Sequence, residues 1–144
     1  EPTMERSPEV FLVRERMMAT GVDFCLDVHG DEGLPYNFIA GANGIPRFGP
    51  RLAELQHGYV DELIRRTPEF QKEHGYPIDP PGQANLSMAT NWVGQTFDCL
   101  SMTLEQPFKD ASNRPHSDGW TPKRARRLGQ VQLDVLRSVI DRLR

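Results

Sequence analysis

Residues 22–28, with the sequence VDFCLDV, form a nearly continuous apolar run rich in strand-forming residues, and the fold class follows from this run and its neighbours. Only two acids, Asp23 and Asp27, interrupt the run, which is typical of an inner strand covered on both faces. Residues 99–104, CLSMTL, form a second mostly apolar run, and residues 36–40 are a shorter strand candidate. These runs predict a sheet inside the protein.

Stretches in which apolar residues recur at helical spacing alternate with these strands. The first opens with a Ser-Pro-Glu start signal and carries the apolar stripe Val10, Val13 and Met17. The alternation of helices with buried strands predicts an α/β architecture, with helices packed on the faces of a sheet. Helices are predicted over residues 8–20, 50–64, 87–97 and 122–143, and Thr67-Pro68-Glu69 is predicted to begin a short additional one.

The composition is that of one globular domain and excludes several other classes of protein. The 144 residues hold 17 Lys+Arg and 20 Asp+Glu, a formal net charge of −3, which argues against a protein that coats nucleic acid. No stretch approaches the roughly 20 apolar residues that span a bilayer, and no secretory signal peptide is visible. Two cysteines are too few for a disulfide framework. We therefore expect a cytoplasmic protein without nucleic-acid or membrane partners.

Reactive side chains stand at the carboxyl ends of the two longer strands, which is where ligands gather in open α/β sheets. The first strand delivers His29 at its last position, and the second strand delivers Glu105. If these strands are parallel neighbours, the two side chains meet over the same edge of the sheet. An imidazole beside a carboxylate suits a metal ligand paired with a general base.

Structural roles for the same residues stay open when the residues are considered alone. A strand-end histidine can be a hydrogen-bonded structural residue, and Glu105 can belong to a structural ion pair, since a carboxylate that ends an apolar strand needs a partner. His29-x-x-Glu32 is a spacing that can pair on a metal, although it often arises by chance. Asp27 can orient a metal ligand or cap a backbone amide. The HExxH motif, a phosphate-binding loop and a Gly-x-Ser-x-Gly turn are absent.

Four short segments stand in an informative order and spacing: Asp27-Val28-His29-Gly30, Leu34-Pro35-Tyr36-Asn37-Phe38, Met88-Ala89-Thr90-Asn91-Trp92 and Met102-Thr103-Leu104-Glu105-Gln106-Pro107-Phe108. Together they resemble the second half of a zinc metallocarboxypeptidase of the M14 type, in its bacterial, cytosolic-carboxypeptidase-like branch. No single segment is decisive. The resemblance extends from about residue 7 to the final helix.

The resemblance implies a fold and a role for three residues. The implied fold is the C-terminal part of a mixed, largely parallel sheet with helices on both faces. His29 matches the third zinc ligand of the family, and Glu105 matches the general base that activates a water and then protonates the leaving amine. Tyr76 is the candidate for the family's mobile, substrate-binding tyrosine. The implied reaction is zinc-dependent hydrolysis of the C-terminal peptide bond of a peptide or protein.

The resemblance also implies that residues 1–144 are the C-terminal portion of a single catalytic domain whose N-terminal portion is absent. In the family, two further zinc ligands come from an upstream His-x-x-Glu motif and an Asn-Arg pair binds the substrate carboxylate; both would precede Glu1. The abrupt opening Glu1-Pro2-Thr3 agrees with this, so the chain alone is expected to be incomplete and inactive, with the missing portion as its partner. Two alternatives stay open: a zinc amidohydrolase acting on N-acyl amino acids, and a non-catalytic α/β module.

Overall fold

The computed structural model describes residues 1–114 and 118–143, and it confirms the α/β architecture. Among the described residues, no helix is long and apolar enough to cross a membrane. In chain order the elements are α1 (Pro8–Thr20), β1 (Phe24–Asp31), β2 (Phe38–Gly41), α2 (Pro50–Arg66), α3 (Ala89–Phe97), β3 (Leu100–Pro107) and α4 (Pro122–Val139), followed by a 3-10 turn at Ile140–Arg142.

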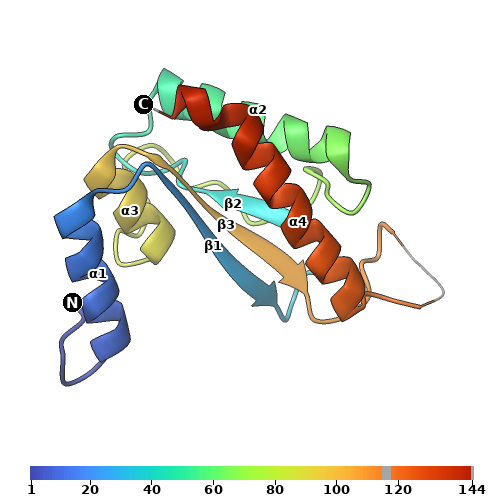
Figure 1. Cartoon of the computed structure of the whole chain (residues 1–144), viewed down its shortest axis with the longest axis horizontal. Helices are drawn as coiled ribbons and strands as arrows, with labels where there is room; N and C mark the ends of the chain where they lie inside the picture. The colour runs from blue at the N-terminus through green and yellow to red at the C-terminus, as the bar shows by residue number, and fades with distance from the viewer. Residues whose placement is uncertain (115–117, 144) are drawn as a thin grey trace.

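The described residues form one mixed, three-stranded sheet in the order β1-β3-β2 (Figure 1). β3 runs parallel to β1 and antiparallel to β2, so the expected largely parallel sheet is represented here by one pair of each kind. The central strand β3 is buried along nearly its whole length, as its mostly apolar sequence predicts. β1 lies at the edge of the described sheet, and its residue Val28 is 55% exposed.

Helices cover both faces of the sheet, and the alternation of side chains along β3 decides which helices they meet. Leu100, Met102 and Leu104 share one face, where they join the apolar core formed with α2 and α4. Thr103 points to the other face, against α3, where its hydroxyl oxygen is 2.6 Å from that of Thr90. Figure 1 shows α2 and α4 side by side, in agreement with the extensive contact between them.

The helices α2 and α4 form and pack because each carries an apolar stripe at helical spacing. α4 begins at Thr121-Pro122 as predicted, since the Thr121 hydroxyl accepts a hydrogen bond from the amide of Arg124 at 3.3 Å. The hydroxyl of the buried Tyr59 joins the two helices by donating to Gln132 Oε1. The buried residues are Leu52, Leu55, Tyr59 and Leu63 on α2 and Leu128, Gln132, Val135 and Val139 on α4.

Two features of the predicted helices differ in the structure. Thr67-Pro68-Glu69 form a turn and not a helix, because Thr67 is extended, with φ −144° and ψ 131°, as a residue that precedes a proline prefers. α1 is helical as predicted, but none of its residues is buried, and Val10 and Val13 are about half exposed. A cation–π contact at 4.3 Å places Arg14 of this helix over the ring of Trp92.

Candidate active site

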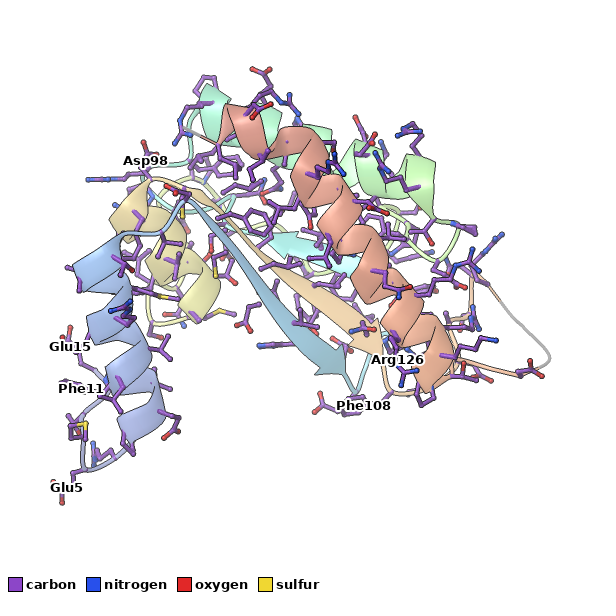
Figure 2. All side chains as sticks on the ribbon, viewed as in Figure 1. Glu5, Phe11, Glu15, Asp98, Phe108 and Arg126 are labelled. Atoms are coloured by element: carbon purple, nitrogen blue, oxygen red, sulfur yellow. The ribbon has the colours of Figure 1, made fainter. Side chains whose placement is uncertain are left out.

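The parallel pairing of β1 and β3 brings the two predicted strand-end residues together. His29 lies opposite Glu105 in the register, and its Nδ1 atom is 3.7 Å from Glu105 Oε1. Phe108, labelled in Figure 2, lies at the carboxyl end of these strands against Gly30, where a Cβ atom would be only 2.0 Å from the Phe108 ring. The predicted meeting of an imidazole and a carboxylate at this edge of the sheet is confirmed.

Asp27 contacts the imidazole of His29 from the other side. The two residues share one face of β1 because side chains alternate along a strand, and His29 Nε2 is 3.0 Å from Asp27 Oδ2. A carboxylate on one ring nitrogen fixes the tautomer and the orientation of an imidazole, so that the other nitrogen can bind a metal. Of the two roles considered for Asp27, the structure supports the orienting one.

Glu105 is an ionisable side chain inside an apolar strand, and it is only 5% exposed. Its Oε2 atom is buried and has no hydrogen-bond partner among the residues that the structure describes. Burial raises the pKa of the Glu105 carboxyl; the positive charge of His29 lowers it, and the carboxylates of Asp31 and Asp27 raise it further. A carboxylate with an unused oxygen and a raised pKa is suited to accept a proton.

Tyr76 reaches this cluster from the proline-rich loop between α2 and α3. Its hydroxyl donates a hydrogen bond to Asp31 Oδ2 and lies 3.4 Å from Glu105 Oε1. Its ring packs edge-on against Phe38, with the ring centroids 4.9 Å apart. Burial, together with the hydrogen bond to Asp31, raises the pKa of the Tyr76 phenol. The structure thus brings the three predicted site residues, His29, Glu105 and Tyr76, into one cluster.

Asp31 also belongs to this cluster, and the sequence did not predict it. It is the last residue of β1, it is 6% exposed, and it continues the alternation of Asp27 and His29 on one face of the strand. That alternation, carried two residues past the predicted end of the strand, is the signal that could have found it. Glu32 is exposed in the turn that follows. Among the residues that the structure describes, no group of three or more His, Cys, Asp or Glu side chains is arranged to hold a metal.

A cavity of about 620 Å³ lies beside the cluster. Its walls come from β2, α2, the loop that carries Tyr76, and α3. It also reaches Thr103, which precedes Glu105 by two residues and therefore shares its face of β3. Neutral polar side chains, among them Asn43, Gln56, Thr90 and Asn91, line it together with apolar and charged ones.

The donor chemistry of the cluster fits one part of a zinc site. His29 offers an imidazole nitrogen oriented by Asp27, and Glu105 places a buried carboxylate next to it. A catalytic zinc site takes about three ligands from the protein and keeps one position open. His29 could supply one such ligand, and a complete zinc site would then need further ligands from outside this cluster.

Comparisons with known proteins identify what the chain is similar to. A metallo-carboxypeptidase from Pseudomonas aeruginosa, in complex with (2-guanidinoethylmercapto)succinic acid, is 50% identical, with a TM-score of 0.96 over 100% of this chain and 38% of that one. A metallo-carboxypeptidase from Burkholderia cenocepacia is 40% identical, with a TM-score of 0.91 over 97% of this chain and 37% of that one. An uncharacterised protein of Zymomonas mobilis is 49% identical over 99% of this chain and 38% of its own length. No model of a protein family matches the sequence. The chain spans less than two fifths of each of these relatives.

Proposed function

We propose that this chain, which resembles the C-terminal part of a metallo-carboxypeptidase in sequence and in fold, supplies one zinc ligand and the general base of a larger metallocarboxypeptidase catalytic domain. His29 is the ligand and Glu105 is the base. The observation that carries the proposal is the pairing of these two side chains, 3.7 Å apart, at the carboxyl ends of parallel strands. The reaction is hydrolysis of the last peptide bond of a peptide or protein, with release of one amino acid.

The part that each residue plays follows from its surroundings. A zinc ion held in part by His29 would supply Lewis-acid chemistry at the scissile carbonyl and would lower the pKa of the attacking water. Asp27 engages Nε2 of His29, so that Nδ1 is the nitrogen available for binding. Glu105 takes a proton from the attacking water and then donates it to the leaving amine, since burial raises its pKa and makes the protonated form accessible.

Tyr76 and the neighbouring cavity supply surface for binding the substrate. The Tyr76 hydroxyl lies 3.4 Å from Glu105 Oε1, within reach of a peptide whose last bond lies beside Glu105. Thr103 connects Glu105 to the cavity along one face of β3. The volume of about 620 Å³ is ample for the side chain of the released residue.

Exposed apolar surface on β1 and α1 supports the proposal that this chain is part of a larger catalytic domain. β1 has an unpaired edge in the described sheet, and α1 buries no residue. Val28 on β1 and Leu12 and Val13 on α1 are each more than half exposed. Native proteins normally cover unpaired strand edges and contiguous apolar faces. We propose that the N-terminal portion of the same catalytic domain packs on this surface of β1 and α1. That portion would also bring the remaining zinc ligands.

The test uses the full-length protein that contains this chain, loaded with zinc. We expect release of single amino acids from peptides with a free C-terminus and no cleavage of the same peptides with a C-terminal amide. A chelator should abolish the activity, and added zinc should restore it. Hydrolysis of N-acyl amino acids without cleavage of peptides would identify an amidohydrolase instead. A protein that neither hydrolyses these substrates nor binds zinc would be a non-catalytic module, contrary to the proposal.

A further inference from the structure

We propose that Asp31 is a positioning residue that holds the hydroxyl of Tyr76 beside Glu105. This role rests on the proposed function, because it assigns Asp31 a part in the same site. Asp31 acts through Tyr76, whose hydroxyl donates to Asp31 Oδ2 while its oxygen lies 3.4 Å from Glu105 Oε1. The 46% exposure of Tyr76 means that packing alone does not hold its side chain in this place.

Asp31 is itself fixed by the turn that follows β1. Its Oδ1 accepts hydrogen bonds from the amides of Gly33, at 2.7 Å, and Leu34, at 2.5 Å. Its backbone carbonyl accepts a bond from the amide of Phe108 at 3.2 Å, which ties the end of β1 to the end of β3. With Oδ1 engaged and the residue 6% exposed, Oδ2 presents an acceptor in a fixed direction.

The Tyr76 hydroxyl meets two carboxylates but has only one hydrogen to donate. Its hydrogen bond to Asp31 Oδ2 is the shorter of the two contacts, and the contact to Glu105 Oε1 is at the outer limit of hydrogen bonding, at 3.4 Å. Asp31 therefore has two effects. It keeps the phenol close to Glu105, and it takes the hydrogen that Glu105 would otherwise accept, which leaves Glu105 Oε1 available for proton transfer.

A purely turn-forming role for Asp31 can be separated from this one, because its two oxygens have different partners. In Asp31→Asn, the amide oxygen can still accept the bonds from Gly33 and Leu34. The NH₂ group then takes the place of Oδ2 and cannot accept a hydrogen bond from the phenol. The substitution retains the turn and removes the anchor of Tyr76.

The first measurement is of kcat and KM for the full-length, zinc-loaded enzyme on a peptide substrate. Asp31→Asn and Tyr76→Phe are each expected to lower kcat/KM about tenfold, which corresponds to about 1.4 kcal/mol, and the double variant is expected to lose no more than either single variant. Tyr36→Phe is the matched control, because it keeps a ring stacked on His74 and is expected to match the wild type. The proposal is overturned if Asp31→Asn does not lower kcat/KM. It is also overturned if Asp31→Asn lowers kcat/KM by the same factor in the wild type and in Tyr76→Phe.

Tyr76→Phe also covers the case in which Asp31→Asn does not fold. Removing the phenol hydroxyl leaves both turn bonds of Asp31 in place. If the Tyr76 hydroxyl is held in place for the reaction, its removal must lower kcat/KM. Unchanged kinetics in Tyr76→Phe therefore overturn the proposal without any result from Asp31→Asn.

The second measurement needs no activity, and it separates this proposal from the proposed function. In ¹⁹F NMR spectra of the protein labelled with fluorotyrosine, the Tyr76 resonance is the one that Tyr76→Phe removes. Asp31→Asn is expected to shift this resonance and to leave those of Tyr36 and Tyr59 unchanged. A shift in a protein without peptidase activity supports the anchoring and counts against the proposed function. Peptidase activity with no shift and no kinetic coupling counts against the anchoring alone.

Discussion

Glu105→Gln is expected to stabilise the protein while it removes the proposed base. Glu105 is 5% exposed, and its Oε2 has no hydrogen-bond partner among the described residues. An ionised carboxylate in such a position costs more free energy than a neutral amide of nearly the same shape. If Glu105 is the base, the residue that the reaction needs is one that lowers the stability of the folded protein.

The sign of the effect follows from the raised pKa of Glu105. Because the pKa is higher in the folded protein than in the unfolded chain, the ionised group destabilises the folded state at any pH above the folded value. Below the ordinary value of 4.5, both states bind the proton and this destabilisation disappears. We expect the gain in the free energy of unfolding in Glu105→Gln to be larger at pH 8 than at pH 4 by about 1–2 kcal/mol, the typical cost of a buried, unsatisfied polar group.

Urea denaturation of the metal-free, full-length protein, followed by circular dichroism at the two pH values, measures this difference. Glu54→Gln on the exposed side of α2 is the matched control, and it is expected to change the free energy of unfolding by less than about 0.5 kcal/mol. A Glu105→Gln variant that is less stable than the wild type at pH 8, or whose effect is the same at both pH values, would show that ionised Glu105 does not destabilise the folded protein.

Three other side chains give measurable effects. Tyr59→Phe is expected to lower the free energy of unfolding in urea by about 1–2 kcal/mol, because it removes the buried bond to Gln132 Oε1 of 2.9 Å; unchanged stability would contradict this. Hydrogen bonds from Arg65 and Arg66 lower the pKa of Glu62 from 4.5 to about 2. The ionised Glu62 therefore stabilises the folded protein above pH 4.5, and this stabilisation is lost as the pH falls to 2. Glu62→Gln should thus lower the free energy of unfolding, measured by thermal denaturation, by about 0.5–1 kcal/mol at pH 7 and have little effect near pH 2. An effect independent of pH would count against the ion pairs. His29→Ala should weaken zinc binding by the full-length protein at least about tenfold, and unaltered zinc content in elemental analysis would argue against its role as a ligand.

Local sequence predicted that His29 and Glu105 meet only on the condition that their strands are parallel neighbours, and the structure confirms that condition. Each residue ends an apolar run, and parallel strands place their carboxyl ends at the same edge of a sheet. The pairing of Asp31 with Tyr76 could not be predicted in this way, because the two residues are 45 positions apart and meet only when the loop returns to the strand. Tyr76 was identified through the family resemblance, and the structure is what places its hydroxyl near Glu105.

Helical spacing predicted where α1 lies but not what covers it. An apolar stripe indicates which side of a helix avoids water, and the element that buries this side depends on the rest of the fold. In α1 the stripe residues Val10 and Val13 are about half exposed, whereas the stripe of α2 is buried against the sheet and α4. The turn at Thr67-Pro68-Glu69 shows the opposite limit, because the restriction on the residue before a proline outweighed the start signal for a helix.

Turnover of the full-length protein carrying Glu105→Gln tests directly whether Glu105 is the general base beside a zinc ligand supplied by His29. Peptide hydrolysis and zinc content are to be measured on the same preparation. We expect kcat to fall at least about 100-fold and the zinc content to stay at the wild-type level. Turnover close to that of the wild type, with zinc bound, would contradict the assignment of Glu105 as the base.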